Sequence, residues 1–177
     1  SYKPLPGAEE QIYRLISDIT ISMKSTDHLT MPKLISSEYR VYLSQDEWDA
    51  YEEMKKQFIL DLPDGEISAA NAAALSGKLS QMANGAIYDN AGNTVLIHDR
   101  KLDALEDLIE AANEKPVLVA YWFKHDLQRI KKRFAVRELK SSKDIGDWNN
   151  GKIPVAVIRP ASAGHGLNLQ AGGSTLI

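Results

Sequence analysis

The sequence predicts an α/β fold in which helices flank a mainly parallel sheet. Short apolar runs at 117–123 and 155–158 are rich in β-branched residues and have no polar face. Such runs are typical of strands that are buried on both sides of a parallel sheet. Segments with helical periodicity, about ten residues long, separate the predicted strands, which is the pattern of successive strand–helix–strand units. We therefore expect the sheet in the C-terminal half of the chain, preceded by linker helices and a small hairpin.

Composition limits the classes of function. The 177 residues are 44% hydrophobic and 25% charged, as expected for a globular protein with a sizeable core. The net charge of −3 does not indicate nucleic-acid binding, because such domains are usually strongly basic. Any DNA contact must therefore come from a local patch or from another part of the protein. The chain has no cysteine and only four scattered histidines, so we expect neither disulfides nor a zinc site. No apolar run reaches the roughly 18 residues of a membrane span and no secretory signal is visible. We therefore expect a cytoplasmic protein with no membrane partner.

The first part of the chain predicts one helix, one strand and a second, well-capped helix. From Ala8 to Met23, apolar residues recur at helical spacing. The alternation over 37–43 predicts a strand with one wet face. Ser44 and Glu47 then have the spacing of a capping box at the start of the second helix. This interpretation explains Glu47, so we do not assign Asp46 and Glu47 as the acidic pair of an NTPase site. The residues expected on the buried side of the second helix are Trp48, Tyr51, Met54 and Phe58.

The middle of the chain predicts a turn, a helix and a hairpin. Residues 63–65 have turn composition, and a helix is expected from about Ser68 to Asn84, with Gly85 as its C-terminal cap. Residues 86–88 and 94–97 flank a polar turn and predict the hairpin.

Alternating helices and strands are expected after residue 100. We expect helices over 101–113, 125–134 and 141–148, and strands over 117–123 and 135–139. Basic side chains surround the second of these helices: Lys124, Arg129, Lys131, Lys132, Arg133 and Arg137. They form either a DNA-facing patch or, as is more common for runs of charge, a solvated helix face.

The last segment, from Pro154 to Ile177, contains the most informative loop. A buried strand ends at Pro160 and is followed by small residues that include Gly164 and Gly166. Glycines at this spacing let the backbone approach a ligand closely and present N–H groups to an anion. The alternative is an ordinary tight connection between a strand and the next element.

This loop resembles motif V of superfamily-two helicases, in the form seen in Swi/Snf-like DNA-dependent ATPases. The matching residues are Ala163-Gly164-His165-Gly166-Leu167-Asn168-Leu169, followed by Thr175-Leu176-Ile177. The spacing between the glycines is one residue shorter than the common form and is similar to phage-encoded relatives. The strand over 117–123 and the helix after it resemble motif IV, and residues 75–84 resemble the family's helix before the second lobe.

The resemblance runs over most of the chain in the family's order and implies three parts. Residues 1–35 would be an N-terminal linker with a helix, and residues 36–98 would link two lobes. Residues 99–177 would be a C-terminal RecA-like lobe that stops before motif VI. We therefore expect a fragment of a longer ATP-dependent DNA helicase or translocase.

The resemblance also implies site residues and partners. In this family motif V lies at the cleft between two RecA-like lobes and touches DNA on one side and the nucleotide on the other. By position, Lys124, Ser162, Ala163 and Gly164 would contact DNA, and Gly164, Gly166 and Asn168 would lie toward ATP. Asn168 is equally well explained as a turn residue that bonds its own backbone.

The implied partners are DNA and the N-terminal lobe of the same polypeptide, with ATP and Mg²⁺ as cofactors of the full-length protein. The chain contains no phosphate-binding GxxxxGK[ST] motif and no acidic pair after a strand, so we assign it no catalytic residue or metal ligand and expect it to be inactive alone. The competing hypothesis is a non-catalytic α/β module that binds a ligand or a protein.

Overall fold

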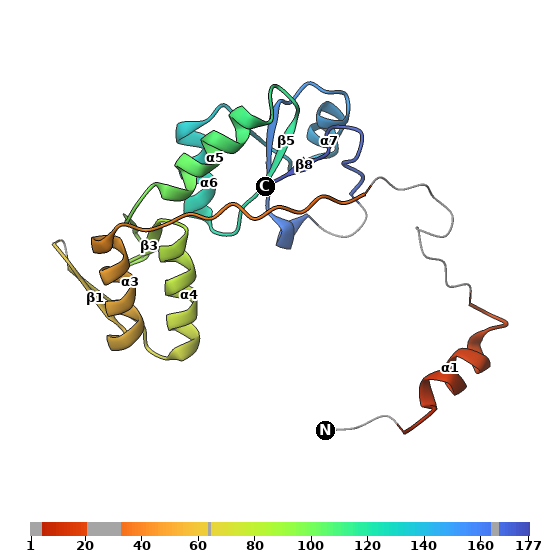
Figure 1. Cartoon of the computed structure of the whole chain (residues 1–177), viewed down its shortest axis with the longest axis horizontal. Helices are drawn as coiled ribbons and strands as arrows, with labels where there is room; N and C mark the ends of the chain where they lie inside the picture. The colour runs from red at the N-terminus through yellow and green to blue at the C-terminus, as the bar shows by residue number, and fades with distance from the viewer. Residues whose placement is uncertain (1–4, 21–32, 64, 164–166) are drawn as a thin grey trace. The chain divides into compact units, whose positions relative to one another are not determined.

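The computed structural model describes residues 5–20, 33–63, 65–163 and 167–177, and the chain divides into two units, Ser1–Glu38 and Tyr39–Ile177 (Figure 1). The first unit contains α1 (Ala8–Ile16), which is shorter than the predicted helix. Glu9 and Glu10 in its first turn suit the positive end of the helix dipole. Ile19, which was predicted on its apolar face, follows the helix and is exposed, and Met23 lies outside the described residues.

The second unit begins with two helices and two antiparallel hairpins. Its elements are α3 (Gln45–Gln57), β1 (Ile59–Leu62), β2 (Gly65–Ser68), α4 (Ala72–Ala83), β3 (Ala86–Tyr88) and β4 (Thr94–Leu96). Strand β1 pairs with β2, and β3 pairs with β4. Their shared core consists of Met54, Leu60, Ile67, Ala69, Met82 and Ile87. The predicted hairpin over 86–97 is confirmed. Strands β1 and β2 were not predicted, since the sequence indicated only the turn between them.

The capping box at the start of α3 is confirmed. The Ser44 amide donates to a Glu47 carboxylate oxygen at 2.7 Å, and the Glu47 amide donates back to the Ser44 hydroxyl at 3.4 Å. Arg100 also pairs with Glu47, at 3.1 Å. The prediction that Trp48 is buried was wrong, because its side chain is 49% exposed and stacks on Tyr51.

The strand predicted over 37–43 was also wrong. Residues 33–44 have no strand assignment, although Val41 and Leu43 are half-buried and Tyr42 is exposed, as the alternation requires. A side-chain hydrogen bond connects this segment to residue 107, since the Tyr39 hydroxyl donates to the Asp107 carboxylate at 3.0 Å.

The predicted α/β class and its parallel sheet are confirmed. The remaining elements are α5 (Arg100–Ala111), β5 (Val117–Ala120), α6 (Lys124–Arg133), β6 (Arg137–Glu138), α7 (Ser142–Asn149), β7 (Val155–Ile158), the 3-10 turn η1 (Pro160–Ser162) and β8 (Thr175–Leu176). The strand order is β6-β7-β5-β8, and all neighbours are parallel.

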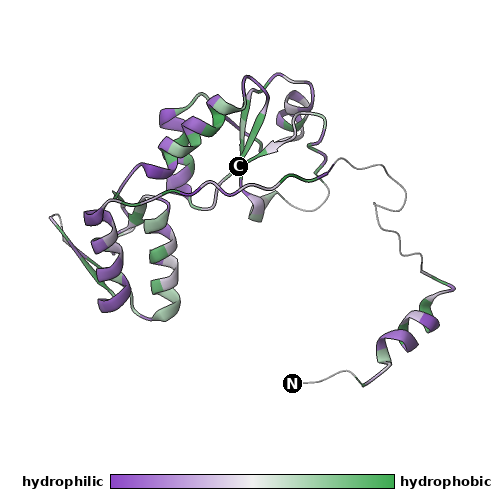
Figure 2. Cartoon of the chain, viewed as in Figure 1, coloured by the Kyte–Doolittle hydropathy of each residue, from purple (hydrophilic) through white to green (hydrophobic). Residues whose placement is uncertain are grey.

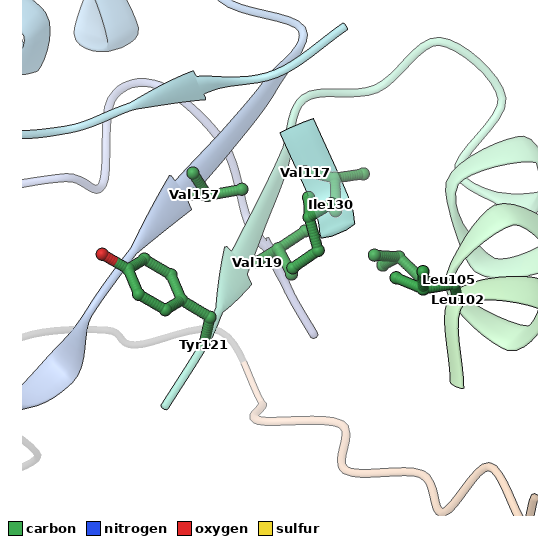
Figure 3. Close-up of a cluster of buried hydrophobic side chains, with 7 residues drawn as sticks. All are labelled: Leu102, Leu105, Val117, Val119, Tyr121, Ile130 and Val157. Atoms are coloured by element: carbon green, nitrogen blue, oxygen red, sulfur yellow. The ribbon is translucent and has the colours of Figure 1, made fainter. Parts of the chain in front are cut away.

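Side chains from the two faces of this sheet enter two different cores. On one face, Val117 and Val119 of β5, Tyr121 directly after it and Val157 of β7 form a cluster with Leu102 and Leu105 of α5 and Ile130 of α6 (Figure 3). On the other face, Ala156 and Ile158 pack with Trp148 of α7. Apolar colouring therefore runs along the strands, while the helices carry apolar and polar stripes (Figure 2). The sheet is the middle of three layers, which explains why its strands have no polar face.

The connections that follow β5 and β7 leave the carboxyl edge of the sheet in opposite directions. From β5 the chain passes through α6 to β6, beyond β7, and from β7 it passes to β8, beyond β5. In open α/β sheets, ligands bind outside the carboxyl ends of strands at such a reversal. The loops after β5 and β7 are therefore where a site is expected.

Candidate nucleotide and DNA interface

The two loops start side by side at the carboxyl edge of the sheet. Ala120 lies opposite Ile158 in the ladder, and the Tyr121 amide donates to the Ile158 carbonyl at 3.0 Å. The next residues, Trp122 after β5 and Arg159 after β7, therefore leave the sheet at the same level. This pairing brings the motif IV-like and motif V-like segments together at the carboxyl edge of the sheet.

Trp122 is not part of the buried strand, which corrects the prediction of a strand over 117–123. Strand β5 ends at Ala120, and the Trp122 side chain is 57% exposed. Trp122 lines a cleft of about 510 Å³ together with Tyr88, Gly92, Phe123, Lys124 and Arg159. Sequence reasoning missed Trp122, Tyr88 and Arg159 as site residues. The signal that could have found Trp122 is the lysine two residues later, since polar residues begin where a buried strand ends.

Packing around His125 fixes the floor of this cleft. The His125 side chain is fully buried, with the Phe123 ring stacked on it at 5.2 Å and the Tyr88 ring edge-on at 5.0 Å. The His125 amide donates to the Tyr88 hydroxyl at 3.2 Å. These contacts join the β3–β4 hairpin to the start of α6, so both walls of the cleft belong to one packed structure.

Most of the basic cluster around α6 is occupied by ion pairs. Arg129 pairs with Asp99, Lys131 with Glu138, Arg133 with Asp103 and Glu106, and Arg137 with Asp144 and Asp147. Four of the six cations therefore have carboxylate partners within the unit. Lys124, at the first position of α6, is exposed and differs from the other five because it lines the cleft.

Arg129 also joins α6 to the end of α4 and to the segment after β4. Its guanidinium donates to the carbonyls of Asn84, at 2.6 Å, and His98, at 2.5 Å, and its side chain is only 12% exposed. The Asn84 side chain donates to Asp126 at 3.0 Å. Burial by itself would raise the pKa of Asp126. Hydrogen bonds from His125 and from the Phe123 amide outweigh this effect and hold the pKa below its usual value, so the carboxylate stays ionised. The C-terminal end of α4 is thus fixed at the carboxyl edge of the sheet.

The start of the motif V-like loop lies on the same edge as Lys124. Ser162 is the last residue of η1, and the Ala163 amide donates to the Pro160 carbonyl at 3.2 Å. The Ala163 methyl packs against the core on the α7 face. The Ala163 amide is therefore engaged in a turn, which restricts its predicted role toward a phosphate. Gly164 and Gly166 lie outside the described residues.

The end of this loop turns away and lies over α7. The Asn168 carbonyl accepts from the Asn149 side chain at 2.9 Å, and its side-chain oxygen accepts from the Gln170 amide at 3.3 Å. The second bond is the local turn that was the alternative explanation for Asn168. The Trp148 indole donates to the Leu169 carbonyl at 2.9 Å. The structure thus groups Lys124, Ser162 and Ala163 at the edge of the sheet and holds Asn168 against α7.

A second cavity, of about 360 Å³, lies between α5, α6 and the strand ends. Its lining is largely apolar and includes Leu102, Leu105 and Val119. Its polar and charged lining residues already bond to one another or to other parts of the unit; they are Asn84, Lys101, Asp126 and Arg129. Trp122 lines both this cavity and the cleft and so separates them.

Tyr121 and Glu138 form a buried polar pair beside the site. The Tyr121 hydroxyl donates to the Glu138 carboxylate at 2.8 Å. Burial and this carboxylate raise the pKa of Tyr121 to about 12. The phenol is therefore a fixed hydrogen-bond donor near neutral pH and not an acid or base for chemistry.

In the part of the chain that the structure describes, no three histidine, aspartate or glutamate side chains come together as a metal site, so none of these residues is assigned to Mg²⁺. No described helix has both the length and the apolar character needed to cross a bilayer.

The chain is similar to a protein of an endosymbiont phage. No family model matches the chain. The chain is 42% identical over 179 residues to protein p41 of Acyrthosiphon pisum secondary endosymbiont phage 1. The aligned region covers 99% of this chain and 39% of p41, so the chain spans about two fifths of the length of this relative.

Proposed function

We propose that the chain is the second RecA-like lobe, with its linker helices, of a Swi/Snf-type ATP-dependent DNA translocase. The observation that carries the proposal is the pairing of the loops after β5 and β7. These loops have the sequence features of motifs IV and V, and they leave one edge of a parallel sheet at the same level. In the proposed motor, this edge faces DNA, and the motif V-like loop connects the DNA contact to the nucleotide between the lobes.

Two further features support the proposal. The phage relative is much longer than the matched region, which leaves room for an N-terminal lobe with the phosphate-binding loop and the Mg²⁺ carboxylates. The end of α4, which resembles the family's helix before the second lobe, is held on the sheet by Asn84 and Arg129. A lobe whose linker is fixed in this way can move as one body when the two lobes close around ATP.

The experiment uses the intact protein with duplex DNA and measures DNA-stimulated ATP hydrolysis. Ser162→Ala removes one hydroxyl and should change the melting temperature little, because such small changes usually stay within about 0.5 kcal/mol. We expect it to lower the DNA stimulation of ATP turnover while leaving DNA-independent turnover unchanged. Gln128→Ala, an exposed position on α6, is the matched control. Wild-type stimulation in a stably folded Ser162→Ala protein would remove Ser162 from the DNA contact, and intact protein without DNA-stimulated hydrolysis would favour the non-catalytic module.

A further inference from the structure

The cleft at Trp122 combines aromatic and basic side chains. Trp122, Tyr88 and Phe123 supply rings, and Lys124 and Arg159 supply positive charge. None of the described residues that line it is a carboxylate. A cleft with this lining attracts a ligand that has both a flat apolar face and a negative charge.

The acidic residues near the cleft bond inward. The Asp89 carboxylate accepts from the Ala91 and Asn93 amides, at 2.9 and 2.7 Å, inside the turn of the β3–β4 hairpin. The Asp126 carboxylate accepts from the Phe123 amide at 2.9 Å and also takes the Asn84 side chain. Asp126 thus occupies the amide at the start of α6, and the positively charged side chains that line the cleft are Lys124 and Arg159.

The cleft is built before a ligand arrives. The buried stack of Tyr88, His125 and Phe123 fixes its floor, and the strand pairing fixes the starting points of Trp122 and Arg159. A rigid site loses little conformational entropy on binding. In contrast, more than half of the Trp122 side chain has no protein partner, so its ring is the part of the cleft that remains to be covered.

We propose that this cleft binds an unpaired nucleotide of single-stranded DNA, with the base on the Trp122 ring and the phosphate between Lys124 and Arg159. A volume of about 510 Å³ is within the usual range for a site that takes one small ligand. Bases in an intact duplex are stacked on one another and offer no face to a side chain, whereas bases of a single strand do. The choice of DNA rests on the proposed function, and the cleft adds a preference for DNA that contains unpaired bases.

The test compares single-stranded and duplex DNA binding by the full chain. Fluorescence anisotropy would measure the affinity for a labelled oligothymidylate of about 15 nucleotides and for a duplex of the same length. Trp122→Leu keeps apolar bulk but removes the aromatic face. We expect it to weaken oligothymidylate binding by roughly 5- to 100-fold, the effect of losing one stacked base, and to leave duplex binding unchanged.

Three variants separate stacking from folding and from charge. Trp48→Leu removes a tryptophan of similar exposure in α3, outside the cleft, and should bind oligothymidylate like the wild type. Trp122→Phe keeps an aromatic face and should retain most of the affinity. Lys124→Gln should weaken binding and reduce the slope of log affinity against log salt by about 0.7, as expected for one lost phosphate contact on a single strand.

Several results would overturn the proposal. They are wild-type oligothymidylate affinity in Trp122→Leu, an equal loss for duplex and single strand, and equal or tighter binding of oligouridylate. Competition by ATP as effective as that by oligothymidylate would show a nucleotide pocket instead. ATP hydrolysis by the intact protein is a separate measurement. Trp122-dependent oligothymidylate binding without DNA-stimulated ATP hydrolysis would refute the translocase proposal but support single-stranded DNA binding in the cleft. DNA-stimulated ATP hydrolysis without Trp122-dependent binding would refute only the proposal for the cleft.

Discussion

Adding one methyl group at Gly172 should destabilise the protein strongly, although glycine-to-alanine changes are often harmless. A Cβ built at Gly172 lies 2.2, 2.3 and 2.5 Å from the Nε1, Cδ1 and Cε2 atoms of the Trp148 ring. Carbon atoms in contact are normally about 3.5–4.0 Å apart, so either the ring or the loop must move by more than about 1 Å. Trp148 is 1% exposed and is packed in the core on the α7 face, so it has no space to retreat.

The expected size of the effect follows from two losses. Overpacking a filled core costs about 1–3 kcal/mol. Displacing the indole also breaks its hydrogen bond to the Leu169 carbonyl, which contributes about 1 kcal/mol. We expect Gly172→Ala to lower the free energy of unfolding by about 3 kcal/mol, which corresponds to a decrease in Tm of roughly 6–12 °C for a chain of this size.

Gly146→Ala is the matched control because it makes the same chemical change in a different setting. Gly146 lies inside α7, and a Cβ there has no neighbour within 4 Å. Alanine in a helix interior is more stable than glycine by about 0.5–1 kcal/mol, so this variant should be slightly more stable than the wild type. Urea denaturation followed by circular dichroism measures both variants. If Gly172→Ala were as stable as Gly146→Ala, the close approach of this loop to Trp148 would be refuted.

Two further predictions concern buried and exposed charges. Arg129→Met should destabilise the chain by about 2–4 kcal/mol in urea denaturation, because it leaves two backbone carbonyls without their donor. Arg133→Gln should have a much smaller effect, because the ion pairs of Arg133 are exposed to solvent, and equal effects would contradict the buried role of Arg129. Hydrogen bonds from Ser141, and further ones from Arg137, lower the pKa of Asp144 from 3.8 to about 2, so its contribution to stability is present above about pH 4 and is lost as the pH falls toward 2. Asp144→Asn should flatten the acid side of the stability profile between those pH values, and an unchanged profile in a thermal-melt series would show that the carboxylate is not coupled to folding.

Local patterns in the sequence were sufficient wherever one short segment supplies both partners of an interaction. The capping box of Ser44 and Glu47 closes within four residues, and Gly85 ends α4 with a left-handed backbone angle. The apolar run at 155–158 forms β7 because four apolar residues without a polar face can only be buried on both sides. These features required no knowledge of distant contacts.

The predictions that failed depend on partners far away in the sequence. The alternation over 37–43 is correct for side-chain exposure, but a strand also needs another strand beside it, and no strand among the described residues pairs with this segment. The β1–β2 hairpin was missed because each strand has only four residues and depends on the core around Met54 for burial.

The candidate site divides along the same line. The sequence alone shows that two unusual loops follow two buried strands, and it supplies the residues of both loops. It does not show that β5 and β7 are neighbours, that β5 stops before Trp122 and exposes its ring, or that Arg129 turns inward to bond Asn84 and His98, since these features follow from the packing of distant segments. The physical reason is that the exposure of a ring and the pairing of a charge depend on which surfaces meet it. Those surfaces here, the β3–β4 hairpin and the end of α4, come from residues at least 30 positions away in the chain.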